Sequence, residues 1–182
     1  MKFSLFYFDG DGSARNENAY QLLMDSAKFA DKNGFAALWL PERHFHAFGG
    51  LYPSPAVIHA ALSQVTKNVH LRAGSVVAPL HHPVRVAEEW SVLDNLSGGR
   101  AGIAVAAGWT MPEFIMSREP HGLRRSLMWQ NYEAIRKLLP TGPGDKWSPE
   151  TKHLLVHAAR GTEHKMVPPR LHIIFRENLP VD

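Results

Sequence analysis

Residues 71–109, LRAGSVVAPLHHPVRVAEEWSVLDNLSGGRAGIAVAAGW, constrain the fold of this chain more than any other stretch. Residues 71–77 form an apolar run rich in small and β-branched side chains, which is typical of a buried parallel strand. Pro83 stands where a helix can begin, because the first turn of a helix makes no use of that backbone N–H. Apolar residues then recur at helical spacing up to Leu96, and Gly98 and Gly99 suit a left-handed helix end. With an apolar strand at residues 101–107, the stretch predicts one βαβ unit.

The rest of the chain repeats this alternation of strand and helix. We expect strands over residues 2–8, 35–40 and 69–77, and helices near residues 20–33, 54–65, 84–96 and 124–139. Such alternation indicates a parallel sheet with right-handed crossovers. Two α/β folds fit it, an open doubly wound sheet and a (β/α)8 TIM barrel. The sequence contains neither the glycine fingerprint of dinucleotide-binding domains nor a Walker A lysine motif.

Composition narrows the class of protein. The chain has 182 residues, 45% of them hydrophobic, so it can bury one sizeable core. It has no cysteine, which excludes disulfides and thiolate chemistry and makes a cytoplasmic location the expectation. No apolar run approaches the ~20 residues of a membrane span, and the first residues do not resemble a signal peptide. With 20 Lys+Arg against 17 Asp+Glu and no basic block, neither nucleic acid nor a membrane is an expected partner.

Unusual polar residues follow the expected strands, at the end of the sheet where a parallel barrel carries its active site. His44 is one of them, and an imidazole there can exchange a proton near neutral pH. Adjacent histidines do not point together as a metal pair does, and the sequence has no H-E-x-x-H motif, so we expect no metal. The residues concerned are Glu42, Arg43, His44 and His46 after the second strand, His81 and His82 after the third, and Gly108 and Trp109 after the fourth.

Three motifs resemble the bacterial luciferase-like flavin-dependent monooxygenases, most closely the branch found in natural-product biosynthesis. They are PERHFHAFGG at residues 41–50, LRAGSVVAPLHHPVRVAEEWSVLDNLSGGR at residues 71–100 and AVAAGW at residues 104–109. The resemblance covers residues 1–139. It implies a TIM barrel that uses reduced FMN, supplied by a separate flavin reductase, and O2 to oxygenate a small-molecule substrate. A deazaflavin is the alternative cofactor, because the two share a similar ring seat.

The resemblance also implies roles for individual residues. It places His44 at the family's catalytic histidine; without the motif, a histidine that hydrogen-bonds loop carbonyls would be the better interpretation. Small residues let a flat ring approach the backbone, although close packing of strand on helix needs them equally. The resemblance makes these the seat of the isoalloxazine ring: Ala73, Gly74, Ser75, Ala106, Ala107 and Gly108.

The expected substrate pocket contains Glu42, His46, Phe48 and Trp109. Loop packing explains His46 and Phe48 equally well, and Glu42 has a second interpretation as a partner of Arg43 or an anchor of the loop. Arg100 begins the fourth strand, at the end of the sheet opposite the expected site. For it we expect a structural role, such as an ion pair with Asp94.

The chain is short for a complete barrel, which takes about 200–250 residues. Residues 1–140 are expected to form a luciferase-like half-barrel of about four βα units, and residues 141–182 an irregular tail rich in proline and histidine that does not match the family. A gene fragment, a frameshifted or alternatively ended product and a true short variant are all compatible with this, and we favour a truncated or altered product. Because a half-barrel leaves two sheet edges open, we expect residues 171–175 to cover one edge and a homodimer to cover the other.

Two classes of function remain. The first is an FMN-dependent monooxygenase acting on an organic intermediate of a biosynthetic pathway. The second is a catalytically inactive truncated relative that acts only as a fold or a dimer partner. In the family the FMN phosphate is held by loops of the second half of the barrel, so we expect the chain as given to bind FMN weakly or not at all.

Overall fold

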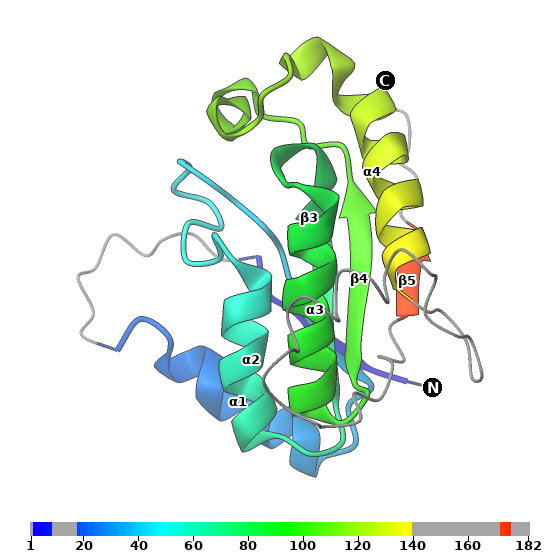
Figure 1. Ribbon diagram of the computed structural model, residues 1–182. Coiled ribbons are helices and arrows are strands. Elements are labelled where there is room, and N and C mark those ends of the chain that lie inside the picture. The colour runs from blue at the N-terminus through cyan, green and yellow to red at the C-terminus, as the bar shows by residue number, and fades with distance from the viewer. Residues whose placement is uncertain (1, 9–17, 140–171, 176–182) are drawn as a thin grey trace, which may run out of the picture.

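A computed structural model describes residues 2–8, 18–139 and 172–175 (Figure 1). Five strands form one sheet in the order β1-β2-β3-β4-β5, and every neighbouring pair is parallel. They are β1 (Ser4–Phe6), β2 (Ala37–Leu40), β3 (His70–Val77), β4 (Ala101–Ala106) and β5 (His172–Phe175). Four helices follow the first four strands in turn: α1 (Gln21–Lys32), α2 (Pro55–Val65), α3 (Pro83–Ser97) and α4 (Arg124–Leu138). This sequential order confirms part of a TIM barrel and excludes the strand order of a dinucleotide-binding domain.

The predicted ranges agree with the observed elements to within a few residues at their ends. Three short 3-10 helices escaped prediction: η1 (Ala78–Leu80), η2 (Met111–Met116) and η3 (His121–Leu123). Each lies in a loop after β3 or β4. Helices this short carry no repeating apolar pattern, so periodicity cannot detect them.

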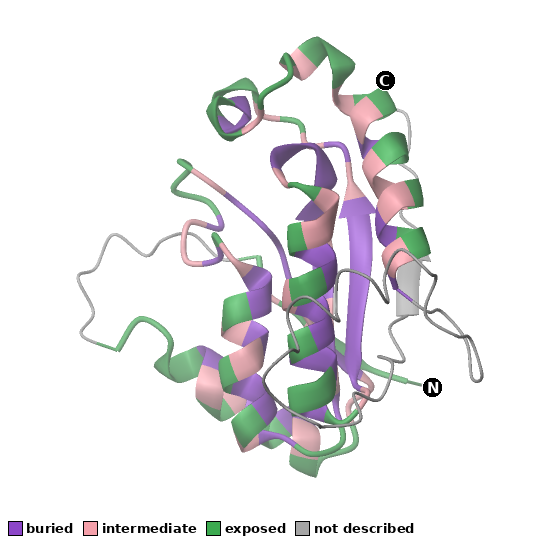
Figure 2. Ribbon diagram, in the orientation of Figure 1, coloured by how far each residue is buried: buried purple, intermediate pink, exposed green. Residues whose placement is uncertain are grey.

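The core lies between the sheet and the layer of helices (Figure 2). Ala87, Trp90 and Leu93 of α3 are buried as their spacing predicted. Leu96, the last residue of that predicted stripe, is 52% exposed. Phe29 of α1 is likewise exposed, so the apolar faces of both helices are narrower than the sequence indicated.

Arg100 holds the amino-terminal end of β4 in place, opposite the end where active sites of parallel barrels lie. Its guanidinium donates hydrogen bonds to Thr66 Oγ1 at 2.9 Å and to the carbonyl oxygens of Val69 at 2.8 Å and Thr66 at 3.0 Å. Asp94 accepts a hydrogen bond from the backbone N–H of Ala101 at 3.3 Å. Arg100 thus has the expected structural role, fulfilled largely by backbone and hydroxyl acceptors.

The strand β5 extends the sheet beyond β4, with Gly102 aligned to His172 and Val105 to Phe175. A segment within residues 171–175 therefore covers one sheet edge, as expected. The rest of residues 141–182 lies outside the described part of the chain, and the proposed boundary at residue 140 stays a prediction. Among the described helices, none combines the length and apolar character needed to cross a membrane.

Candidate active site

Glu42 is the centre of a polar cluster at the carboxyl ends of β2 and β3. It follows β2 directly after Pro41, and its side chain is buried. A bulge in β3 helps to hold it, since the register with β4 passes from Gly74 to Val76 and leaves out Ser75. The carbonyl oxygen of Ser75 accepts a hydrogen bond from the backbone N–H of Glu42 at 3.1 Å. The loop that carries Glu42 is therefore fixed to the neighbouring strand.

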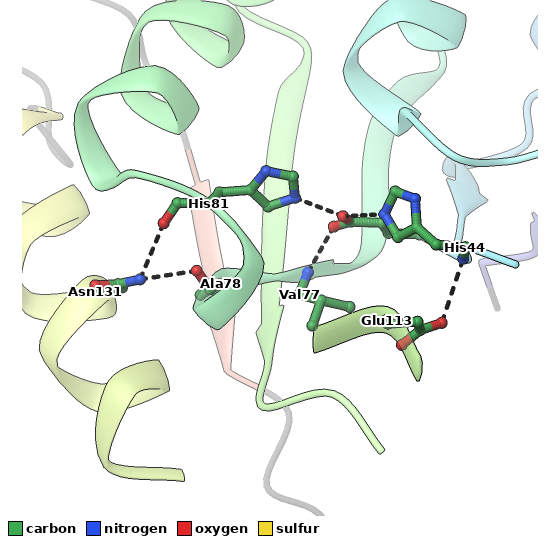
Figure 3. Close-up of polar contacts among 7 residues, drawn as sticks. His44, Val77, Ala78, His81, Glu113 and Asn131 are labelled. Atoms are coloured by element: carbon green, nitrogen blue, oxygen red, sulfur yellow. Dashed lines mark hydrogen bonds and ion pairs between the residues drawn. The ribbon is translucent and has the colours of Figure 1, made fainter. Parts of the chain in front are cut away.

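The Glu42 carboxylate binds two histidines from different loops (Figure 3). Its Oε1 lies 2.8 Å from His44 Nε2 and 2.5 Å from His81 Nε2. Its Oε2 accepts a hydrogen bond from the backbone N–H of Val77 at 2.7 Å. The loops after β2 and β3 thus meet at one carboxylate, as neighbouring strands of a parallel barrel should allow.

The charges of this cluster stabilise one another. Burial alone would raise the pKa of Glu42, but the hydrogen bonds from His44, His81 and Val77 together hold that pKa below its usual value. Burial alone would lower the pKa of His81, but the hydrogen bond and charge of Glu42 raise it. Glu42 is accordingly ionised near neutral pH and accepts hydrogen bonds only, so both histidines donate through Nε2–H.

His44 is further held through its own backbone. Its N–H donates to Oε1 of Glu113, from η2, at 3.3 Å. Glu113 is 1% exposed. Only 9% of the His44 side chain is exposed. His44 therefore lies at the carboxyl end of the sheet, close to the end of β3, with its ring and its main chain both anchored.

Arg43 packs among aromatic rings. Its guanidinium carbon lies 5.0 Å from the ring centre of Trp109, 5.7 Å from that of Phe48 and 5.9 Å from that of Phe8. These are cation–π distances. Glu42 turns to the histidines instead, so the cluster is organised differently from a Glu42–Arg43 pair.

The other residues expected in the substrate pocket, His46, Phe48 and Trp109, are linked by contacts with one another and with Arg43. Trp109 is 62% exposed and packs edge-on to His46 with ring centres 6.1 Å apart. The Nδ1 of His46 accepts a hydrogen bond from the backbone N–H of Phe48 at 3.1 Å, which shapes the loop. Phe48 contacts the ring of Phe8 at 5.0 Å. His46, Phe48 and Trp109 thus form an aromatic rim around the Arg43 guanidinium.

The six small residues expected to seat a flavin ring divide into two groups. Ala73, Gly74 and Ala107 are buried, and the side chains of Ala73 and Ala107 are in the hydrophobic core. They can therefore face a ligand only through their backbone. Ser75, Ala106 and Gly108 are partly exposed at the ends of β3 and β4.

Gly74 of β3 is in close contact with the Phe6 ring. A Cβ atom added there would lie 2.7 Å from Cε2 of Phe6 and 3.1 Å from Cε3 of Trp39. Only glycine allows the Phe6 ring to approach the backbone so closely. Phe6 is 44% exposed. A flavin ring would lie beside Phe6 or displace it.

Sequence reasoning did not assign His81, Glu113 or Asn131 to the site. Asn131 of α4 donates to the carbonyl oxygens of Ala78 at 2.8 Å and His81 at 3.2 Å, and so ties α4 to the loop that carries His81. The adjacent histidines were a visible signal, but nothing local distinguishes His81, which reaches Glu42, from His82. Glu113 and Asn131 lie far along the chain in segments without a recognisable motif.

Comparison with known proteins identifies the family. The family described as luciferase-like monooxygenase matches residues 1–173. The oxygenase component of the flavin-dependent trigonelline monooxygenase of Acinetobacter baylyi is 32% identical over 142 residues, which are 77% of this chain and 38% of that protein. The alkanal monooxygenase alpha chain of Photorhabdus luminescens is 32% identical over 66% of this chain and 33% of its own length.

Among solved structures, the monooxygenase RslO1 from Streptomyces bottropensis superposes with a TM-score of 0.73 at 25% identity, covering 96% of this chain and 52% of that one. The chain therefore belongs to the luciferase-like monooxygenase family, as its three motifs indicated. It spans less than half the length of these two curated relatives. The match also continues past residue 140, into the segment expected to diverge.

Proposed function

We propose that this chain is the part of a flavin-dependent monooxygenase that carries its acid–base histidine and one side of its flavin seat. The observation that supports this most strongly is the bond between His44 and Glu42 at the carboxyl end of the sheet, next to the small residues of β3 and β4. Family membership supports the reaction class. The name of the trigonelline enzyme supports the use of flavin.

In this proposal His44 moves the proton that oxygen transfer requires. Because Nε2–H is committed to Glu42, the neutral ring takes up a proton at Nδ1. The ionised carboxylate stabilises the imidazolium that results, in the way a buried acid orients a catalytic histidine. Glu42 is thus a positioning residue for His44.

The flavin would lie over Ser75, Ala106 and Gly108, with the backbone of Ala73, Gly74 and Ala107 beneath it. When bound, reduced FMN supplies the electrons with which O2 is activated. The chain's own contribution is to offer a flat, partly apolar surface and to exclude water through the aromatic rim of His46, Phe48 and Trp109. A small organic substrate of a biosynthetic pathway would enter over that rim, and a separate flavin reductase would supply the reduced cofactor.

A flavin without its phosphate tests the ring seat. Lumiflavin carries the isoalloxazine ring but no ribityl phosphate. We expect this chain to hold the ring without the loops that bind the phosphate. Titration with the full chain should then quench the fluorescence of lumiflavin and of FMN with similar, weak affinities.

A substitution in the seat supplies the control. Ala106→Leu places a larger side chain where the ring would lie and should abolish binding of both flavins. Val57→Leu, on the exposed face of α2, should leave binding unchanged. The absence of saturable quenching by either flavin, in a chain shown to be folded by circular dichroism, would refute the ring seat and favour a catalytically inactive relative.

A further inference from the structure

Three metal-ligating side chains converge in this protein, although the sequence alone argued against a metal. Glu42, His44 and His81 each offer one ligand atom, and these three atoms lie within 4.8 Å of one another. They come from the loops after β2 and β3 and are directed to one point in Figure 3. The sequence-based expectation considered His81 only with its neighbour His82, whereas the fold brings His81 to His44.

The distances suit a single small cation. Glu42 Oε1 lies 2.8 Å from His44 Nε2 and 2.5 Å from His81 Nε2. Ligand atoms around a tetrahedral zinc ion at ~2.0–2.1 Å lie about 3.3 Å apart, so the Glu42 oxygen and the two histidine nitrogens need to separate by about 0.5–0.9 Å to admit the ion.

Neighbouring residues orient the three ligand residues by hydrogen bonds, as the outer partners of established metal centres do. The free oxygen of the carboxylate, Glu42 Oε2, is fixed by the backbone N–H of Val77 at 2.7 Å. The main chain of His81 is held by Asn131 Nδ2, 3.2 Å from its carbonyl oxygen. The main chain of His44 is held by Glu113, 3.3 Å from its N–H. All three ligands are thus oriented before any ion arrives.

The geometry points to a binding site for one Zn2+ ion, or a similar divalent transition ion, formed by Glu42, His44 and His81. Two imidazole nitrogens and one carboxylate oxygen are the ligands that Zn2+, Co2+ and Ni2+ accept, whereas Mg2+ and Ca2+ favour oxygen ligands. Three protein ligands leave a fourth position open, which is typical of exchangeable or catalytic zinc sites. The side chain of His81 is 27% exposed, so the ion has a path from solvent.

Binding replaces both Nε2 protons with the ion. In a neutral imidazole the proton on Nε2 is transferred through solvent to Nδ1, and in an imidazolium the Nε2 proton is released to solvent. Each Nε2 lone pair is then free to bind the metal. The charge of Glu42 remains, now shared with the cation. An ion bound in this way removes the Glu42–His44 hydrogen bond on which the proposed acid–base role depends. Metal binding itself does not require the chain to be an active monooxygenase, so the two proposals can fail separately.

A cobalt titration tests the site in the full chain. The protein is prepared with a tag that contains no histidine, stripped with a chelator and titrated with Co2+, whose visible absorption reports coordination by nitrogen. We expect one ion per chain and displacement of Co2+ by Zn2+. His81→Asn and His44→Asn should each weaken binding at least about 100-fold, since even outer partners of a metal site contribute about 10- to 100-fold.

His82→Asn is the matched control, because His82 is adjacent to His81 and instead accepts a hydrogen bond from the N–H of Val84 at the start of α3. It should bind Co2+ as the parent does. Loss of binding in all three variants, or in none, would overturn the assignment.

A second measurement needs no variant for its main result. Imidazole 1H–15N correlation spectra distinguish Nδ1 from Nε2 in each histidine. On addition of Zn2+, the signals of two imidazoles should shift, and in both rings the nitrogen that binds the ion should be Nε2. A response spread over other histidines, or through Nδ1, would overturn the proposal even if the substituted proteins do not fold.

Discussion

Nε2 of His44 lies 2.8 Å from Oε1 of Glu42, a carboxylate only two residues earlier in the same loop. Phe45, directly after His44, adopts a positive φ of 53°. Positive φ is uncommon for a residue other than glycine. Unfavourable backbone geometry thus directly follows the histidine of this pair.

Replacing Glu42 with alanine should destabilise the protein. The change leaves the N–H of Val77 and the Nε2–H groups of His44 and His81 without their acceptor in a buried place. Buried groups left unpaired cost about 1–3 kcal/mol each, so we expect a loss of at least about 2 kcal/mol in urea unfolding. Glu42→Gln keeps an acceptor oxygen and should lose less. Equal stability of parent and Glu42→Ala would contradict these contacts.

Replacing His44 with alanine should affect catalysis more than cofactor binding. In a complete, flavin-binding barrel that contains this sequence, removing a general acid or base commonly slows the reaction ~10²–10⁴-fold. Flavin affinity should change little, because His44 lies beside the proposed ring seat and is held by Glu42 and Glu113. Stopped-flow kinetics with titrated flavin separates the two effects. Turnover of the variant at the parent rate would remove His44 from the mechanism.

His59 should make the protein less stable as the pH falls. It is fully buried in α2, and burial lowers its pKa to about 4, only partly offset by its hydrogen bond to the carbonyl oxygen of Arg72. The unfolded chain, with a pKa of 6.5 for this group, binds more protons between about pH 6.5 and pH 4. The contribution of neutral His59 to the free energy of unfolding is therefore fully present above that range. It is lost on acidification, by roughly 2 kcal/mol near pH 5.

Urea unfolding at about pH 7 and about pH 5 measures this loss, and His59→Leu supplies the comparison. The leucine variant has no proton to bind at this position, so its stability should fall less over the same interval. All other titrating groups contribute equally to both proteins. If the two proteins lost the same stability, burial of a neutral His59 would not be the cause.

Two glycines with similar backbone angles should respond differently to alanine. Gly98 ends α3 at φ +69° and would have no heavy atom within 4 Å of an added Cβ, so Gly98→Ala should cost about 1–2 kcal/mol for the left-handed backbone alone. Gly108, at φ +79°, would place that Cβ 2.8 Å from Val77 Cγ1. Gly108→Ala should therefore cost about 1–3 kcal/mol more through overpacking. Thermal unfolding compares the two, and equal losses would show that the contact with Val77 relaxes freely.

The amino-acid sequence by itself determined the elements and their order. Pro83 marks the start of α3, and Gly98 marks its left-handed end at φ +69°. Both signals are local, because they depend on the backbone of a single residue. The alternation of strands and helices fixed the parallel sheet in the same way, since parallel strands need a crossover between them.

Only the tertiary structure decided which side chains share the site. His81 and Glu42 are separated by 39 positions in the chain, and they meet because β2 and β3 are neighbours. His82, with the same side chain one position later, instead accepts a hydrogen bond at the start of α3. Adjacent residues at the end of a strand point in different directions, and the path of the loop selects one of them. That choice depends on contacts with Val77 and Asn131, which no local pattern encodes.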